Sequence, residues 1–224
     1  MILQVQTLDG QPRPAAMPTT KRSAPSGADF YPTPTWVTEA LLAVESFQGR
    51  ILEPACGDGA VSKVLKSAGY AVESSDLYDR GFGVAGRDFL LPVCGGYIWP
   101  IDNIVTNPPY GVAEKFVLRA LEITRHKVAF FLRLAFLESI TRHKSIFSQT
   151  PPARVWVFSE RVTMYPSGKQ TAGGGTTAYA WFVWDRQADS GTQLGWIPPG
   201  SKPKTKKREM PDLGLRLADL GLAK

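Results

Sequence analysis

The sequence is poor in the residues that form disulfides and bind metals. Its 224 residues include two cysteines and two histidines. Cys56 and Cys94 are too few for a disulfide framework, and His126 and His143 do not extend them into a cluster with metal-ligand spacing. We therefore expect neither a disulfide scaffold nor a metal site.

Long hydrophobic runs are missing as well. No apolar run approaches the ~20 residues that span a membrane as a helix. The first ten residues, MILQVQTLDG, lack the charged and then apolar pattern of a secretory signal. We found no internal repeat. These absences predict a cytoplasmic protein without a membrane partner.

What is present is the composition of a globular domain, with 43% hydrophobic and 21% charged residues. The net charge of +6 is uneven, since residues 1–28 carry +2 and residues 198–224 carry +4, which leaves 29–197 neutral. We predict a disordered, Pro-rich basic arm at 1–28, one domain at 29–197 and a basic tail at 198–224. Basic ends either contact the phosphates of a nucleic acid or serve as solvated tails, and the pattern favours neither.

Strand-like and helix-like segments alternate through the first two thirds of the domain. Thr33-Pro34 is a typical helix start, with Thr33 as the capping residue. Predicted strands cover 51–53, 70–74, 104–106 and 128–132, and predicted helices follow Pro34, Gly59 and Gly111. This order predicts a parallel sheet with helices on both faces. Strands at 154–158 and 178–184 have no helix between them, so we expect an antiparallel pair that closes one edge of the sheet.

The turn EPACGDG, at 53–59, lies between a predicted strand and a helix. Glycines at such a turn let the backbone approach a ligand, and open parallel sheets bind ligands at the carboxyl ends of their strands. The turn does not have the GxGxxG motif of dinucleotide enzymes. This difference favours a ligand without a pyrophosphate. Its candidate ligand-binding residues are Glu53, Pro54, Ala55, Gly57 and Gly59.

Two further acidic residues follow predicted strands. Asp76, with Leu77 after it, has the position of a carboxylate that accepts both hydroxyls of a ribose, and Glu73 competes for this role from within the strand. Asp88-Phe89 comes where a third strand should end. Asp88 could accept a hydrogen bond from the exocyclic amine of a purine, while Phe89 covers the ring. A solvated turn explains Asp76 equally well, and a turn aspartate followed by a core phenylalanine is the simpler explanation for Asp88-Phe89 taken alone.

The stretch IVTNPPYG, at 104–111, leaves a buried strand through Asn107, Pro108, Pro109 and Tyr110. The lone pair of an adenine or amide nitrogen is delocalised, so the nitrogen is a weak nucleophile. The Asn107 side-chain carbonyl and the Pro108 backbone carbonyl could each accept one of its N–H groups and favour a tetrahedral nitrogen. Two prolines fix the backbone that presents these acceptors, and Tyr110 could stack on the ring.

Asn-Pro-Pro-Tyr and EPACGDG, about 50 residues apart in this order, resemble the catalytic and cofactor motifs of S-adenosylmethionine-dependent DNA adenine-N6 methyltransferases. Phe30-Tyr31-Pro32-Thr33-Pro34 is similar to the segment of that family that closes over the methionine part of the cofactor, which adds Tyr31 and Thr33 to the candidates. This order of motifs matches the gamma group. The resemblance covers roughly 29–185 and implies a class I, Rossmann-like α/β sandwich of three layers. Its seven-stranded sheet would be mostly parallel with an antiparallel last hairpin.

The resemblance further implies direct transfer of a methyl group from S-adenosyl-L-methionine to the N6 amine of an adenine that is flipped out of double-stranded DNA. The 159–177 loop matches the segment that holds the flipped base. Met164 and Tyr165 are its candidate base contacts, and Arg161 and Lys169 its candidate phosphate contacts, together with a basic cluster formed by Arg125, Lys127, Arg142 and Lys144. A solvated face is the simpler explanation for at least half of these cations.

The sequence departs from the gamma group in lacking a large target-recognition domain, since only 114 residues follow Tyr110. We therefore expect a short recognition site or little sequence specificity, as in a stripped-down phage or prophage enzyme. Three alternatives stay open. They are an RNA amine methyltransferase, a methyltransferase of protein glutamine amides, and a non-catalytic nucleic-acid-binding module on the same fold.

Overall fold

The computed structural model of the chain describes residues 30–91, 101–165, 175–189 and 191–202. The predicted arm at 1–28 and all but the first five residues of the predicted tail lie outside these ranges, as do Cys94 and Lys169. Within the described ranges, no helix has the length and apolar character needed to cross a membrane.

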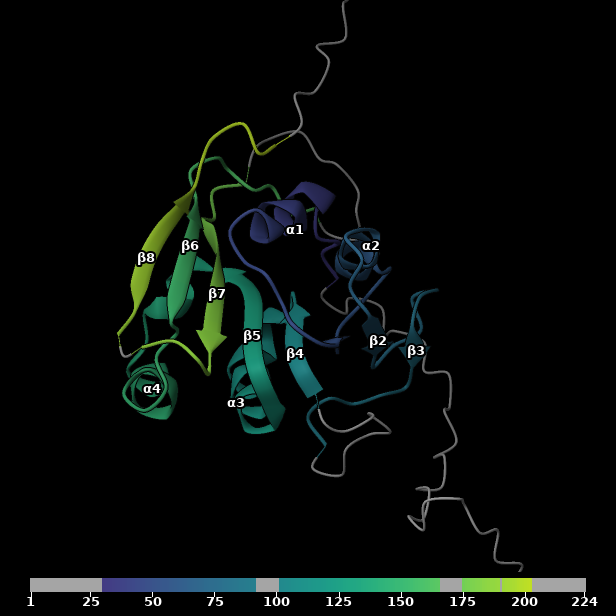
Figure 1. Cartoon of the computed structure of the whole chain (residues 1–224), viewed down its shortest axis with the longest axis horizontal. Helices are drawn as coiled ribbons and strands as arrows, with labels where there is room; N and C mark the ends of the chain where they lie inside the picture. The colour runs from purple at the N-terminus through teal and green to yellow at the C-terminus, as the bar shows by residue number, and fades with distance from the viewer. Residues whose placement is uncertain (1–29, 92–100, 166–174, 190, 203–224) are drawn as a thin grey trace, which may run out of the picture.

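One eight-stranded sheet organises the domain, with the order β3-β2-β1-β4-β5-β7-β6-β8. In Figure 1 the labelled strands run across the sheet from β8 on the left to β3 on the right. The strands are β1 Ile51–Glu53, β2 Val72–Asp76, β3 Val84–Ala85, β4 Ile101–Thr106, β5 Thr124–Arg133, β6 Arg154–Phe158, β7 Tyr179–Asp185 and β8 Gln193–Ile197. All pairs from β3 to β5 are parallel, as the alternating pattern predicted.

The antiparallel part of the sheet confirms one prediction and corrects another. β7 runs antiparallel to both β5 and β6, so the predicted hairpin-like pair exists. It does not close the edge, however, because β8 adds parallel to β6 and makes an eighth strand where seven were expected. The sequence QLGWI of β8 was not recognised as a strand, since a central glycine and exposed flanking residues give it no clear alternation.

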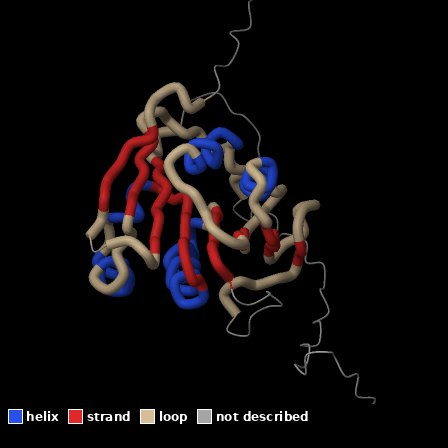
Figure 2. Tube along the Cα trace, in the orientation of Figure 1, coloured by secondary structure: helices blue, strands red, loops and turns tan. Residues whose placement is uncertain are grey.

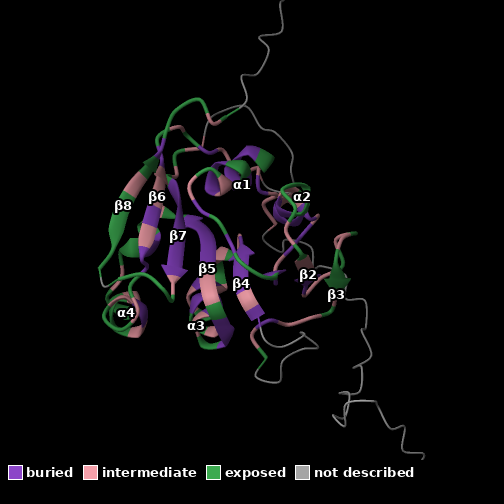
Figure 3. Cartoon of the chain, in the orientation of Figure 1, coloured by how far each residue is buried: buried purple, intermediate pink, exposed green. Residues whose placement is uncertain are grey.

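Helices cover both faces and complete three layers, seen as blue segments around the red sheet in Figure 2. On one face lie α1 Thr35–Leu42 and α2 Ala60–Ser67, and on the other lie α3 Ala113–Ile123 and the short turns η2 Leu134–Leu137, α4 Ile140–Arg142 and η3 His143–Phe147. Alternate residues of β5 serve the two layers, since Phe130 packs with α3 and Phe131 packs with α1. Figure 3 shows β5 and β7 buried and β8 largely exposed.

The start of α1 differs from its prediction in a way that matters for the site. The helix begins at Thr35 and Pro34 takes the capping position, without a side-chain hydrogen bond to the helix backbone. The hydroxyl of Thr33 does not cap the helix. It accepts a hydrogen bond from Asn107, 74 residues away in sequence.

Candidate active site

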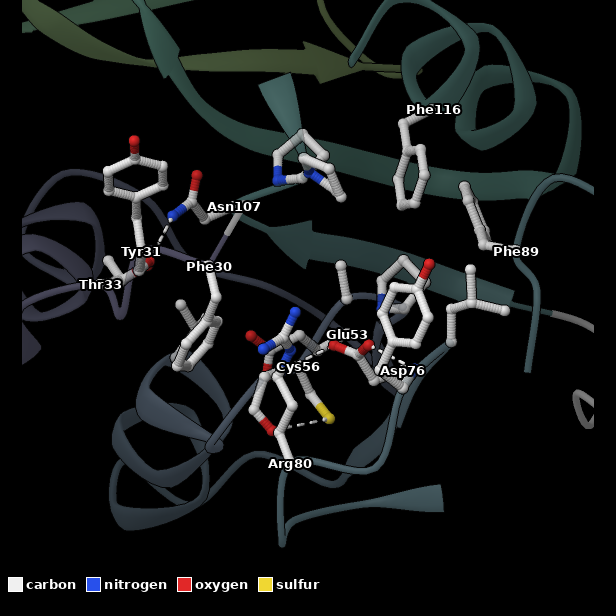
Figure 4. Close-up of a pocket in the computed structure, with 18 of the residues that line it drawn as sticks. Phe30, Tyr31, Thr33, Glu53, Cys56, Asp76, Arg80, Phe89, Asn107 and Phe116 are labelled. Carbon is white, nitrogen blue, oxygen red and sulfur yellow. Dashed lines mark hydrogen bonds between the residues drawn. The ribbon is translucent and has the colours of Figure 1, made fainter. Parts of the chain in front are cut away.

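A cavity of about 380 Å³ opens at the carboxyl ends of β1, β2 and β4, the edge at which parallel sheets bind ligands. Its volume is in the range of small-molecule sites. Figure 4 draws residues of this cavity. Of the residues expected from the sequence to bind cofactor or carry catalysis, the lining includes Tyr31, Thr33, Glu53, Pro54, Ala55, Gly57, Asp76, Leu77, Asp88, Phe89, Asn107, Pro108, Pro109 and Tyr110.

The turn between β1 and α2 uses its two glycines differently. Gly57 lines the cavity with φ +55°, and a Cβ there would lie 2.5 Å from the ring of Phe30. Gly59 does not line the cavity, contrary to its expected role as a ligand contact. It caps α2 with φ +82°, and a Cβ there would lie 2.5 Å from the ring of Phe82. Its glycine is therefore required by the turn and by close packing.

Glu53 ends β1 in a buried polar chain. Its side chain is 1% exposed and accepts a hydrogen bond from the hydroxyl of Ser62 on α2, which lies 2.6 Å from the hydroxyl of Ser74 on β2. Burial raises the pKa of Glu53 to about 8, against the opposing effect of the Ser62 hydrogen bond, and the charges of Asp76 and Asp58 raise it further. Glu53 is therefore mostly protonated at neutral pH.

Asp76 ends β2 beside this chain and is fixed by two backbone amides. Its Oδ2 accepts from Gly57 N at 2.8 Å, and its Oδ1 accepts from Tyr78 N at 2.9 Å. Each oxygen keeps a second lone pair for a ligand, because a carboxylate oxygen accepts two hydrogen bonds. Glu73, the competing carboxylate, forms an ion pair with Arg87 at 2.5 Å and does not line the cavity.

The segment after β3 supplies an apolar wall. Phe89 is 3% exposed and its ring centroid lies 4.9 Å from that of Phe116 on α3. Leu90 and Val112 line the same cavity. Asp88 accepts a hydrogen bond from Leu90 N through Oδ1 and contributes to the lining. Asp88 and Phe89 therefore offer the cavity an acceptor and an aromatic ring at neighbouring positions of the chain.

Asn107 leaves β4 with the two ends of its amide in different environments. Nδ2 donates to Thr33 Oγ1 at 3.0 Å and to the Tyr31 carbonyl at 3.3 Å. Oδ1 is buried and has no hydrogen-bond partner among the described residues. Figure 4 shows the amide nitrogen toward the backbone of Tyr31 and toward Thr33, with the oxygen turned away from that backbone and from Thr33. A backbone carbonyl can only accept, so this orientation of the amide follows from chemistry.

Tyr110 follows the two prolines, at the start of the short helix η1 Tyr110–Val112. Its ring centroid lies 5.8 Å from that of Tyr31 and 6.3 Å from that of Tyr179 on β7. The guanidinium of Arg133, an exposed residue at the end of β5, lies 4.4 Å from the same centroid. Burial, followed by the neighbouring Tyr179, raises the pKa of the Tyr110 phenol well above its usual range.

Several residues of the site were missed by sequence reasoning. Arg80 lines the cavity, and its guanidinium lies 4.3 Å from the ring centroid of Phe30. Phe116 and Arg133 also belong to the surroundings of the motif residues. Each acts through a contact with a residue distant in sequence, so local patterns carry no signal for it. Phe30 belongs to the FYPTP stretch, and its contact with Gly57 also depends on a residue distant in sequence.

The residues expected to contact the target base or DNA do not gather at one place in the structure. Tyr165 lines a second hollow with Pro32–Thr35, next to the first. Met164 instead packs against the core on the α1 side, and Arg161 donates to the Gly175 carbonyl at 2.7 Å. Lys127 and Arg142, from the predicted basic cluster, also have protein partners. Internal contacts therefore occupy half of that cluster.

Cys56 lines the cavity but is not poised to react. Burial, followed by the charges of Glu53 and Asp76, raises the pKa of the Cys56 thiol far above neutrality, so this cysteine is a poor nucleophile. Within the described part of the chain, no group of three or more His, Cys, Asp or Glu side chains is arranged to hold a metal ion.

No protein-family model and no curated protein sequence matches the chain. Solved structures do. A protein from Listeria monocytogenes named as a class I S-adenosylmethionine-dependent methyltransferase aligns over 73% of this chain and 65% of its own, with TM-score 0.52 and 13% identity. A protein from Vibrio vulnificus named as a modification subunit of a type I restriction enzyme aligns over 78% of this chain and 49% of its own, with TM-score 0.53 and 14% identity.

At these identities the likeness concerns the fold. The chain has the Rossmann-like fold of class I methyltransferases, as the sequence predicted, with a mostly parallel sheet and an antiparallel strand near one edge. It spans about two thirds of the first structure and about half of the second.

Proposed function

We propose that the protein is an S-adenosylmethionine-dependent methyltransferase that modifies the exocyclic N6 amine of adenine in DNA. The observation that carries this proposal is the amide of Asn107, whose nitrogen is anchored and whose buried oxygen has no hydrogen-bond partner within the part of the chain that the structure describes. A buried acceptor without a donor is costly, unless a ligand supplies the donor.

The residues of the cavity fit the proposed cofactor. Asp76 would hold the ribose hydroxyls with its two free lone pairs, and Gly57 lets the backbone pass close beside it. Phe89, Leu90 and Phe116 would cover the adenine ring, and Asp88 would accept from its amine. Bound S-adenosylmethionine supplies a methyl group on a positively charged sulfur. The carboxylates of Asp58, Asp76 and Asp88 in the lining suit such a positive charge.

The chain's own residues would prepare the acceptor nitrogen. Asn107 Oδ1 and the Pro108 carbonyl would each accept one N–H of the amine, which releases the nitrogen lone pair from the ring. Tyr110 would stack on the acceptor ring, and its protonated phenol keeps the stacking surface uncharged. No nucleophilic side chain is needed, in keeping with the inert thiol of Cys56.

An adenine base, rather than a glutamine amide, is the proposed acceptor because a flat ring with an exocyclic amine suits both the Asn107 acceptor and the Tyr110 ring. A paired base cannot reach the site, so the adenine would be flipped out of the duplex. Exposed Arg133 lies beside Tyr110 and would meet the phosphates of the distorted strand. The likeness to a restriction-enzyme modification subunit agrees with DNA as the substrate.

The test is identification of the product. The full chain is incubated with S-adenosylmethionine carrying a deuterated methyl group and, separately, with unmethylated double-stranded DNA, RNA and a glutamine-containing peptide. Digests are then analysed by mass spectrometry. We expect deuterated N6-methyladenine from DNA.

Each other outcome has a definite meaning. Label in RNA or peptide alone would retain the methyltransferase and reject the DNA substrate. Label nowhere, with DNA still bound, would favour a non-catalytic binding module.

A further inference from the structure

The segment 30–33 contacts both halves of the site. Phe30 covers Gly57 in the turn after β1, and the Arg80 guanidinium lies 4.3 Å from the centroid of the same ring. One and three residues after Phe30, the Tyr31 carbonyl and the Thr33 hydroxyl accept the two hydrogen bonds from Asn107 Nδ2. The segment that covers the proposed cofactor site therefore also sets the side-chain orientation of the proposed catalytic amide.

We propose that Thr33 is a positioning residue whose hydroxyl holds the Asn107 amide with its oxygen toward the acceptor amine. The inference deepens the proposed function and rests on it. Thr33 is 6% exposed, and its hydroxyl makes the shorter of the two hydrogen bonds to Nδ2. Tyr31 contributes only its backbone carbonyl, so Thr33 is the one side chain among the described residues that holds the amide nitrogen.

The physical reason lies in the near symmetry of an amide. If the Asn107 side chain turned by half a rotation, its NH2 would face the acceptor amine, and two donors would oppose each other. The Tyr31 carbonyl opposes that rotation, because the turned amide would place its oxygen against a second acceptor. The Thr33 hydroxyl adds the shorter of the two hydrogen bonds and so holds the side chain in this orientation. Preorganised acceptors are effective because they need no rearrangement during the reaction.

The position of the segment is held independently of this hydrogen bond. The Phe30 ring lies against Gly57 and under the Arg80 guanidinium, and the Tyr31 ring contacts that of Tyr110. Removal of the Thr33 hydroxyl should therefore leave the cover of the cavity in place while it frees the amide. This separates a positioning role from a structural one.

The experiment compares Thr33→Val, which replaces the hydroxyl by a methyl group, with two reference variants. Thr33→Ser keeps the hydroxyl. Thr38→Val makes the same replacement at a fully buried threonine of α1, outside the cavity, whose hydroxyl has no partner among the described residues. For each we measure the methyl-transfer rate at saturating substrates, the Kd for S-adenosylmethionine and the melting temperature.

We expect Thr33→Val to lower kcat about tenfold, as the loss of one buried hydrogen bond predicts, with the cofactor Kd changed less than about twofold. Thr33→Ser should restore kcat, and Thr38→Val should leave it unchanged. In nitrogen-15 spectra, the side-chain NH2 signals of Asn107, assigned by their loss in Asn107→Ala, should shift in Thr33→Val alone.

Wild-type kcat in Thr33→Val would overturn the proposal. So would equal losses in kcat, cofactor affinity and melting temperature that serine does not reverse. Unmoved NH2 signals in Thr33→Val would overturn the positioning role too, and this measurement does not depend on methyl transfer. A wild-type chain that methylates no acceptor would overturn the proposed function instead. The two failures are therefore distinguishable.

Discussion

At the scale of single residues, Glu53 sets an unusual dependence of stability on pH. Its carboxyl is fully buried, and its pKa rises from 4.5 to about 8 on folding. Between these values the folded chain binds more protons at this site than the unfolded chain. This contribution to the free energy of unfolding is therefore fully present below the unfolded pKa and is lost as the pH rises through 8.

Glu53→Gln should remove this contribution, because glutamine keeps the shape and has no proton to lose. We expect the variant to gain about 2–4 kcal/mol relative to wild type when the pH is raised from 5 to 9. The measurement is urea unfolding of both proteins at the two pH values without cofactor. Other titrating groups cancel in the difference, so an unchanged difference between pH 5 and pH 9 would contradict the assignment.

The identity of the candidate site residues could be predicted from the sequence much better than their roles. Asn107, Asp76 and Asp88 all line the cavity because each ends or follows a strand of a parallel sheet, which places them at one edge. Thr33 was interpreted as a helix cap, and its actual partner is a side chain 74 residues away. Hydrogen bonds of such range leave no local pattern in a sequence.

At the scale of elements, a buried ion cluster joins the end of α1 to three strands. Glu45 accepts from Lys127 on β5 at 2.9 Å and from Trp156 Nε1 on β6 at 2.9 Å, and it forms a further ion pair with Arg154. Arg154 also pairs with Asp185 on β7 at 2.7 Å. Burial alone raises the pKa of Glu45, but these hydrogen bonds outweigh it and hold the pKa below its usual value.

Glu45→Ala should destabilise the fold by about 2–3 kcal/mol, because two partly exposed cations lose a buried partner. The contribution of Glu45 to the free energy of unfolding depends on pH in the opposite direction to that of Glu53. A carboxyl with a lowered pKa adds stability above its ordinary pKa and loses it as the pH falls through the folded value. Thermal unfolding from pH 7 down to pH 3 should therefore show a shallower decline for Glu45→Ala than for wild type. Parallel declines would contradict a role for the ionised carboxyl.

The sequence also predicted most secondary-structure elements of the sheet, but not the last strand, β8. Continuous apolar runs predicted β5 and β7 because these strands are covered on both faces. β8 could not be predicted in this way. Its Leu194 and Trp196 are more than half exposed, and Gly195 is needed because a Cβ there would meet the ring of Trp156. Only the pairing with β6 makes this segment a strand.

At the scale of the whole molecule, the charge lies at the two ends of the chain while residues 29–197 are neutral. If the basic tail contacts DNA, replacement of Lys204, Lys206, Lys207 and Arg208 by glutamine should weaken DNA binding at low salt. The slope of log K against log salt concentration should fall in magnitude by about 2–4, since each phosphate contact contributes about 0.9. The rate at saturating DNA should not change. An unchanged slope would identify the tail as a solvated end without phosphate contacts.

The central claim is that the free oxygen of Asn107 accepts a hydrogen bond from the amine that is methylated. Its most direct test is a single-turnover measurement on Asn107→Ala, with the acceptor identified by product analysis and with the S-adenosylmethionine Kd measured in parallel. We predict a loss of about 100-fold or more in the transfer rate, typical of a lost preorganised contact, and a cofactor Kd within about threefold of wild type. A near-normal transfer rate, or a loss explained by weaker cofactor binding, would contradict the claim.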